Sequence, residues 1–456
     1  MKEVQKVTDL AKLAIAIPQL LLPAGAVELS KWPVVACDQY TSQPEYWERL
    51  AELVGEAPST LQLIFPEVYL GRDDEPARIG RIQRKMAEYL EQEILKPCEP
   101  GFVLVERRTN GGKVRRGLVV ALDLECYDFN KGSRSLIRAT EGTVLERIPP
   151  RVRIREGAPL ECPHILVLID DPQKQVIEPL AEWAGREKPL YDLDLLMNGG
   201  HLTGYAISDP RLVRAIAAGL ARLADPAQFC RKYGTDQSEP LLYAVGDGNH
   251  SLATAKTVWE RLKATLPPEQ ALEHPARFAL VELVNLHDPG LQFEPIHRVV
   301  FHSAQERIIP ALAEGCAADS AQCDWEWLAE GVALQTELEK RRDAAPEAQI
   351  IGVVCASGTG VITMRHSRQQ LAVGTLQTFL DQWLAANPAA EIDYIHGADV
   401  VAALGSQPGN IGFYLPPLAK QQLFKTVVLE GALPRKTFSM GEAEEKRFYM
   451  ECRKIR

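Results

Sequence analysis

The sequence lacks the features that mark several large classes of protein. No apolar run is long enough to cross a bilayer, and the best candidate, residues 13–27, is interrupted by Pro18 and Pro23 and preceded by acidic residues. The nine cysteines are scattered and form no Cys-x-x-Cys pair, which argues against a disulfide framework and against a zinc cluster. We therefore expect a cytoplasmic protein with reduced, mostly structural thiols and no membrane contact.

A surplus of basic residues is also missing. The chain has 51 Lys and Arg against 61 Asp and Glu, a formal net charge of −10, whereas proteins that wrap nucleic acid usually carry a basic face. No stretch indicates a helix-turn-helix motif. We therefore expect no nucleic-acid partner. The apolar fraction of 46% and the charged fraction of 25% are those of an ordinary globular protein.

What is present is a mixture of strand-like and helical segments. Residues 101–124 have the pattern of two strands around an Asn-Gly-Gly turn, and residues 208–224 repeat their apolar side chains at helical spacing. No internal repeat and no low-complexity linker separates these segments. The pattern predicts a mixed α/β (α+β) fold with a core in residues 1–302, a small α/β subdomain at 303–395 and a C-terminal segment, 396–456, packed back on the core.

One turn carries an unusual set of polar groups. The strand-like run PLLYAV ends at Gly-Asp-Gly-Asn-His-Ser, residues 246–251, and the helical stretch LATAKTVWERL follows at once. A strand-turn-helix corner of this kind directs backbone N–H groups and the positive end of a helix at one place, which suits an anion. Two interpretations stay open: an anion-binding site, or a helix capped by Asn249 or Ser251 with His250 packed beside it.

A second candidate group lies in VACDQYTSQPEYW, residues 35–47. Ser42 and Glu45 have the three-residue spacing of a capping box, with Pro44 in the first turn of the helix. The capping box explains why Ser42 and Glu45 are present, but it gives no role to Asp38. Asp38 is therefore a candidate carboxylate that binds an amine or accepts a hydroxyl proton.

A third group lies in VNLHDPGLQFEPIHRVV. Asn285 and His287 stand two residues apart on a predicted strand, where a single histidine is more often structural than chemical. His297 and Arg298 follow the Asp-Pro-Gly turn as adjacent cationic donors, a combination that suits an anionic group.

Together these pieces resemble one family. GDGNHSLATA is similar to the Asp-Gly-His-His-Arg-x-x-x-Ala signature of the uncharacterised family called domain of unknown function 1015, which is related to the ParB/sulfiredoxin superfamily. The further matching pieces occur in family order: ACDQYTS, RRGLVVALDLECYD, ATEGT, HDPGLQFEPIHR, YIHGADVVAAL, GFYLPP and LPRKTF. The resemblance thus spans nearly the whole chain. It departs from the signature at Asn249, where the pattern has its first His, and at Ser251, where the pattern has Arg.

The resemblance implies a ParB/sulfiredoxin-like nucleotide-binding core, distantly similar to free-serine kinase, that binds ATP or ADP with Mg²⁺. It implies catalytic roles for Asp38, Asp247 and His250. It implies nucleotide or phosphate contacts from Gly246, Gly248, Asn249, Ser251, Arg151, His297, Arg298 and Lys436. It implies substrate contacts from Glu141, Thr143, His201 and Asn285. Ligands for the metal are left unassigned. No cysteine lies in the turn, which disfavours sulfiredoxin chemistry.

Two functions follow from this resemblance. The first is a nucleotide-dependent phosphotransferase that acts on a small polar metabolite such as free serine. The alternative is a non-catalytic, nucleotide-binding regulatory protein, which the loss of the signature arginine at Ser251 favours because a bidentate phosphate donor is missing. The partners are then a small-molecule substrate and a nucleotide; a homodimer stays open, as do the identity of the acceptor and the choice between ATP and ADP.

Overall fold

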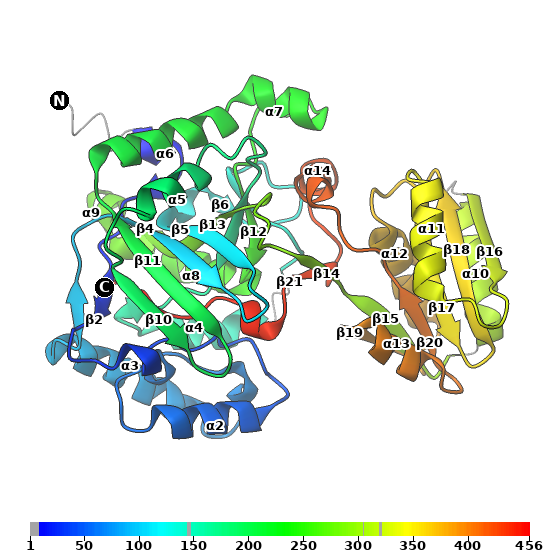
Figure 1. The fold of residues 1–456 in the computed structure, drawn as a ribbon, viewed down its shortest axis with the longest axis horizontal. Helices are drawn as coiled ribbons and strands as arrows, with labels where there is room; N and C mark the ends of the chain where they lie inside the picture. Colours follow the sequence, from blue (N-terminus) through cyan, green and yellow to red (C-terminus); the bar gives the residue numbers. More distant parts are fainter. Residues whose placement is uncertain (1–8, 144–146, 304, 319–321) are drawn as a thin grey trace. The chain divides into compact units, whose positions relative to one another are not determined.

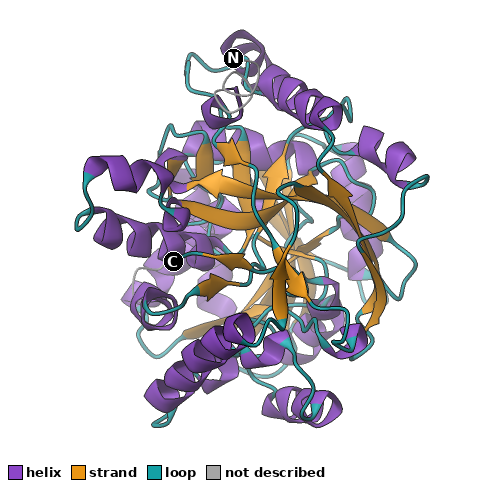
Figure 2. Ribbon diagram, turned by 90° about the vertical axis from the view of Figure 1, so that its left-hand side faces the viewer, coloured by secondary structure: helices purple, strands orange, loops and turns teal. Residues whose placement is uncertain are grey.

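The computed structural model describes residues 9–143, 147–303, 305–318 and 322–456 (Figure 1). They form two compact units, one of Met1–Gln292 with Met440–Arg456 and the other of Phe293–Ser439. Helices and strands alternate in both, so the chain has a mixed α/β fold (Figure 2). Within the described ranges, none of the helices combines the length and the apolar character that a membrane span needs.

The first unit is built on a ten-stranded mixed sheet. Its strands follow the order β10-β11-β4-β5-β13-β9-β12-β7-β6, and β1 pairs with β5. The bounds are β1 Ile15–Ala16, β4 Phe102–Arg108, β5 Val114–Asp123, β6 Tyr127–Asp128, β7 Ile137–Ala139, β9 Leu166–Ile169, β10 Tyr191–Leu195, β11 Gly200–Ile207, β12 Tyr243–Asp247 and β13 Phe278–Asn285. The predicted Asn-Gly-Gly hairpin is confirmed as the antiparallel pair β4 and β5.

The central strands are buried, as their near-continuous apolar sequences require. β9 runs parallel to β13 and antiparallel to β12, and all four of its residues are buried. Strands covered on both faces need apolar side chains on both faces. In β12 only Tyr243, Ala244 and Val245 are buried, and Gly246 and Asp247 emerge from the core. This places the glycine-rich turn at the rim of the sheet.

Helices cover both faces of this sheet. Alternate residues of β5 point to opposite faces, so Leu118 and Val120 join one hydrophobic cluster and Val119 joins the other. The first cluster includes residues of α6 and α8, and the second includes residues of α2 and α3. The bounds are α2 Pro44–Val54, α3 Glu75–Glu91, α4 Ile148–Glu156, α5 Glu178–Ala184, α6 Pro210–Leu223, α7 Pro226–Tyr233, α8 Asn249–Lys263 and α9 Pro268–Glu273.

The capping box predicted from Ser42 and Glu45 is wrong. Helix α2 begins at Pro44, its N-cap is Gln43, and no side chain makes a capping hydrogen bond there. Pro44 has a φ already suited to a helix and needs no partner for a missing N–H. The helix therefore starts one residue later than the box requires, and Glu45 falls at the second helical position instead of the third.

Met440–Arg456 belong to the first unit and pass along its candidate site. Val35 forms a bridge with Phe448, and Leu21 forms a bridge with Cys452. The chain then ends in β22 (Arg453–Lys454), which pairs antiparallel with β8 (Leu160–Glu161). A further pair, β2 (Leu21–Pro23) with β3 (Leu95–Pro97), lies in the same unit.

The second unit has a six-stranded antiparallel sheet in the order β16-β18-β17-β20-β15-β19. The strands are β15 His297–Phe301, β16 Gln322–Trp327, β17 Gln349–Cys355, β18 Gly358–Arg365, β19 Glu391–Ile395 and β20 Ile411–Tyr414, and β14 Phe293–Pro295 pairs separately with β21 Phe438–Met440. The helices are α10 Gln305–Ala318, α11 Leu334–Ala344, α12 Ala372–Ala386, α13 Ala398–Gly405 and α14 Lys420–Glu430.

Candidate functional site

The strand-turn-helix corner predicted at residues 246–251 is present. β12 ends at Asp247, Gly248 takes a left-handed conformation with φ of 81°, and α8 begins at Asn249. Residues that carry a side chain rarely adopt this φ, and a Cβ on Gly248 would lie 3.2 Å from the Cα of Ile165. Glycine is therefore required at the point where the strand turns into the helix.

The N-cap residue of α8 has no side chain with which to cap the helix. Gly248 occupies the N-cap position, which contradicts the interpretation that Asn249 or Ser251 caps this helix. The Asn249 amide instead donates to the Val245 carbonyl at 3.3 Å, and its oxygen accepts from Thr140 N at 3.3 Å. The first backbone hydrogen bond of the helix runs from Leu252 N to Gly248 O. The positive end of the helix dipole lies at this start, where the Gly248 N–H donates to Asp247 Oδ1.

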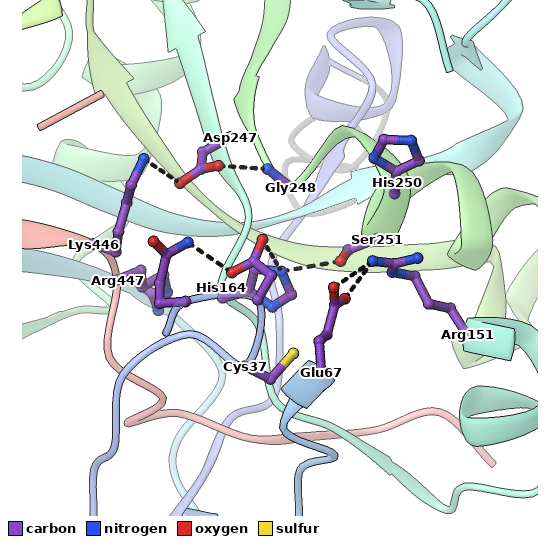
Figure 3. A network of polar contacts seen from close by, with 12 residues as sticks. Cys37, Glu67, Arg151, His164, Asp247, Gly248, His250, Ser251, Lys446 and Arg447 are labelled. Atoms are coloured by element: carbon purple, nitrogen blue, oxygen red, sulfur yellow. Dashed lines mark hydrogen bonds and ion pairs between the residues drawn. The ribbon is translucent and has the colours of Figure 1, made fainter. Parts of the chain in front are cut away.

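A buried cation lies at the same corner. Asp247 accepts a hydrogen bond from Gly248 N at 3.1 Å through Oδ1, and its Oδ2 lies 3.3 Å from Lys446 Nζ (Figure 3). The Lys446 side chain is only 7% exposed. An ammonium group held this deep, beside a helix start, makes the corner attractive to anions.

Ser251, in the first turn of α8, contacts a buried histidine. His164 Nε2 lies 3.0 Å from Ser251 Oγ, and His164 Nδ1 lies 2.9 Å from the Tyr449 hydroxyl. Tyr449 also accepts a hydrogen bond from Cys37 N at 2.9 Å, so its hydroxyl links the backbone of Cys37 to the imidazole of His164.

Asp38 faces the same imidazole. Its Oδ2 lies 3.8 Å from His164 Nε2, and its Oδ1 accepts a hydrogen bond from the Gln39 amide at 3.0 Å. Burial acts to raise the pKa of Asp38, but His164, the Gln39 amide and Lys446 together hold that pKa below its usual value. The neighbouring pKa values move the other way, because burial and nearby carboxylates raise those of Cys37 and Tyr449 far above normal. At neutral pH Asp38 is therefore ionised beside a protonated thiol and phenol.

Arg151 reaches the site from α4 and is held by an acidic partner. Its Nη2 lies 2.5 Å from a carboxylate oxygen of Glu67, and its Nη1 donates to the Arg147 carbonyl at 2.7 Å. Figure 3 shows this pair on the Ser251 side of His164, whereas Lys446 and Asp247 lie on the other side. Lys446 and Arg151 are thus each already paired with a carboxylate.

A cavity of about 140 Å³ lies against this network. His164, Ser251, Tyr449, Cys37, Glu67 and Arg151 line one part of it, and the rest of the lining is mostly apolar. Ser251 therefore belongs both to the corner and to the wall of the cavity.

Comparison with known proteins identifies the family. The family described as "Protein of unknown function (DUF1015)" matches residues 21–383. The chain belongs to this family. No curated protein matches this chain. Three solved structures resemble it weakly: free serine kinase in complex with AMP, at 10% identity over 76% of this chain and 95% of that chain with a TM-score of 0.36; a conserved hypothetical protein from Pyrococcus furiosus, at 11% over 75% and 97% with 0.34; and SbnI with a C-terminal truncation from Staphylococcus aureus, at 10% over 73% and 85% with 0.33.

The fold brings together some of the residues that the sequence predicted for the site. Asp247, Ser251 and Arg151 lie in the network of Figure 3, where the ring of His250 points away from the Ser251–His164 contact. Asp38 joins the same network through His164. Glu141 and Thr143 follow Thr140, whose backbone contacts Asn249. The Thr143 hydroxyl is buried without a hydrogen-bond partner in the described structure. The roles of these residues remain predictions.

Two predicted substrate residues lie elsewhere in the first unit. His201 stands on β11, which four strands separate from β12, and its ring nitrogens lie 2.7 Å from Asp192 and 2.7 Å from Asp194. Asn285 is buried at the end of β13, where its amide donates to Glu178 at 2.6 Å and to the Asp171 carbonyl at 2.9 Å. Both side chains are engaged in local contacts, and neither reaches the corner.

The remaining predicted anion ligands, His297, Arg298 and Lys436, lie in the second unit. The Arg298 guanidinium is fully buried and donates to the carbonyls of Arg435 and Lys436 at 2.9 and 3.0 Å. His297 Nδ1 accepts from Leu415 N at 3.1 Å, and burial together with Arg298 lowers the pKa of His297 to about 4. These contacts stabilise the second unit itself.

Sequence reasoning missed three residues of the site: His164, Lys446 and Tyr449. His164 precedes the buried strand β9, so a polar residue at the edge of a strongly apolar run was the available signal. Lys446 and Tyr449 had no local signal, because each acts on residues far away in the sequence. Tyr449 and His164 are 285 positions apart.

Proposed function

We propose that this protein is a nucleotide-dependent phosphotransferase that acts on a small hydroxylated metabolite. The observation that carries the proposal is the corner itself: a helix start, a glycine N-cap in a left-handed conformation and the buried ammonium of Lys446 meet at one place. Phosphoryl transfer depends mainly on positioning and on neutralising charge, which is what such a corner offers. In this proposal the corner binds the terminal phosphates of ATP or ADP.

The residues beside the corner supply the proton chemistry. The acceptor oxygen attacks the terminal phosphorus, the bond from phosphorus to the bridging oxygen breaks, and the shortened nucleotide leaves with the electron pair. Asp38, ionised because its pKa is lowered, takes the proton from the acceptor hydroxyl. Nε2 of His164 and the hydroxyl of Ser251 orient the acceptor next to the corner.

The described residues do not by themselves form a metal site. They contain no group of three or more His, Cys, Asp or Glu side chains that could hold an ion. Asp247 faces Lys446, and Asp38 faces His164. Mg²⁺ in phosphotransferases is held largely by the substrate phosphates. The mechanism above therefore assigns no step to Mg²⁺, and its participation stays a prediction from the resemblance.

The test is transfer of a labelled phosphate. Purified full-length protein is incubated with γ-labelled ATP or β-labelled ADP and a set of small alcohols and hydroxy amino acids, including serine. We expect a labelled, phosphorylated product whose formation falls strongly in Asp38→Asn, while nucleotide affinity measured by calorimetry stays nearly unchanged. Absence of nucleotide binding at millimolar concentration would reject the proposal.

One observation favours a second function, a nucleotide-binding regulator without turnover. Ser251 replaces the arginine of the family signature, and Arg151 is already bound to Glu67. The site therefore has few cations left to stabilise a transferring phosphoryl group. Tight nucleotide binding with no labelled product would support this alternative. The serine-like acceptor, a homodimer and a cytoplasmic location remain predictions from the sequence.

A further inference from the structure

We propose that the cavity beside His164 binds an apolar body of about six carbon or other heavy atoms, so that the acceptor is an amphipathic alcohol and not a free amino acid such as serine. This inference rests on the proposed function for its reacting group, the hydroxyl. The binding of an apolar body rests on the cavity alone and can be tested separately.

The size and lining of the cavity define the kind of ligand. Its volume is about 140 Å³, and buried apolar side chains from separate segments form most of its wall. These include Leu63, Phe65, Met86, Leu160 and Leu280, none more than 4% exposed. A protein cavity of about 150 Å³ lined by apolar side chains takes up benzene, so the volume here is enough for a body of that size. Filling this space with hydrocarbon is therefore favourable, at about 25 cal/mol per Å² of apolar surface removed from water.

The polar groups in the deeper wall are already satisfied. Glu161 lies 2.5 Å from Arg155 and 2.6 Å from Arg453, and it also accepts from Leu280 N at 2.9 Å. The Thr254 hydroxyl donates to the His250 carbonyl at 2.7 Å. Among the described residues, no lining side chain has a buried polar atom without a partner.

This satisfied lining argues against a free amino acid. Its ammonium and carboxylate are attached to the same carbon, and both would have to leave water within a cavity of this size. Burying a charge without a partner is costly. An alcohol with a hydrocarbon body leaves only its hydroxyl to be satisfied.

The geometry also fixes which end of the ligand reacts. Ser251 and His164 line the cavity, and Ser251 lies in the first turn of α8 beside the corner. A hydrocarbon body inside the cavity therefore leaves its hydroxyl at the Ser251 edge, next to the corner and to Asp38. The hydroxyl oxygen then attacks the terminal phosphorus of the nucleotide, the bridging oxygen leaves, and Asp38 receives the hydroxyl proton.

The first experiment measures binding in the wild-type protein. Benzyl alcohol, 3-methylbutan-1-ol and L-serine are compared by thermal shift and by NMR of protein labelled with ¹³C at the methionine methyl groups. Met86 lines the cavity, and Met86→Leu, which nearly conserves volume, assigns its resonance. We expect both alcohols to raise the melting temperature and to shift the Met86 signal. Serine is expected to do neither.

The second experiment fills the cavity. Ala158 lines it and is buried, so Ala158→Leu adds three carbons to its wall. We expect this variant to lose the stabilisation by both alcohols while it still binds ATP or ADP. If the variant does not fold, the Met86 signal of the wild type decides the question. An unmoved Met86 signal, or equal responses to serine and to the alcohols, would overturn the inference.

The outcomes separate the two proposals. If the alcohols occupy the cavity but the protein binds no nucleotide, the proposed function fails and the apolar site stands. If serine is phosphorylated and the alcohols do not bind, the apolar site fails and the phosphotransferase stands.

Discussion

Lys446 Nζ lies 3.3 Å from Asp247 Oδ2, so two segments that are far apart in sequence share one buried ion pair. Asp247 ends a core strand, whereas Lys446 belongs to the C-terminal segment that returns to the first unit. The lysine supplies a positive charge that residues 246–251 do not contain themselves. An ammonium group next to a helix start strengthens the preference of that start for anions.

Removing this charge is expected to weaken nucleotide binding. Hydrogen bonds to charged groups contribute about 1.5–3 kcal/mol, so Lys446→Met should raise the Kd for ATP or ADP about 10- to 100-fold. Calorimetry measures the affinity, and urea unfolding checks that the variant is folded. Lys454→Met, at an exposed position of β22, is the matched control and should bind nucleotide normally. Equal affinities of the two variants would exclude a role for Lys446.

The lowered pKa of Asp38 has a consequence for stability. A carboxyl group with a lower pKa in the folded than in the unfolded state stabilises the folded state above the unfolded pKa of about 3.9, and this contribution disappears as the pH falls through the folded value. Between pH 5 and pH 2 the wild type should therefore lose more stability than Asp38→Asn. Urea unfolding at a series of pH values measures this difference. Parallel curves for the two proteins would show that the pKa of Asp38 is not lowered.

Gly248 allows a test of the corner as structure. Gly248→Ala should destabilise the protein by more than about 1–2 kcal/mol, because alanine adds both left-handed strain and a Cβ 3.2 Å from the Cα of Ile165. Gly234→Ala is the matched control: Gly234 has φ of 66°, and nothing lies within 4 Å of its added Cβ. The Gly234→Ala variant should show only the loss of stability that left-handed backbone strain causes. Denaturant unfolding compares the two, and an equal loss would mean that the contact with Ile165 costs nothing.

Cys162 and Cys452 are expected to form a disulfide under mild oxidation. Their Sγ atoms lie 3.2 Å apart, and the register of β8 and β22 continues to place the two residues opposite each other. The hydrogen bond with Cys162 and burial raise the pKa of the Cys452 thiol far above normal, so the pair should stay reduced without an oxidant. Diamide takes up two electrons and two protons as the S–S bond forms. Mass spectrometry of peptides should then find this link, and Cys162→Ser should lack it. Other cysteine pairs formed at the same rate would contradict the expectation.

Much of the local structure could be predicted from the sequence. The Asn-Gly-Gly turn predicted the hairpin of β4 and β5, and the change from a strand-like to a helical pattern at residues 246–251 predicted the corner. These features depend on short-range sterics and on the period of apolar residues, which a linear sequence displays directly. The start of α2 was misjudged because two local signals, the Ser42–Glu45 spacing and Pro44, pointed to different first residues and the proline prevailed.

Only some residues of the candidate site could be predicted from the sequence. Asp38, Asp247 and Ser251 could be singled out because their surroundings suggest turns and helix starts. His164 stood at the beginning of an apolar run, and Lys446 and Tyr449 lay in a segment without a distinctive pattern. Conversely, arginine is a residue type that often binds anions, but the guanidinium of Arg298 donates to backbone carbonyls of the second unit.

By itself, the sequence determined which segments form strands and helices, where the chain turns sharply and that the chain resembles one family, because these properties depend on neighbouring residues. Only the tertiary structure decided which side chains meet. Cys37 N donates to a tyrosine 412 positions away, and that tyrosine in turn orients His164. Such contacts arise from the packing of distant strands and of the returning C-terminal segment, and no local pattern of residues encodes them.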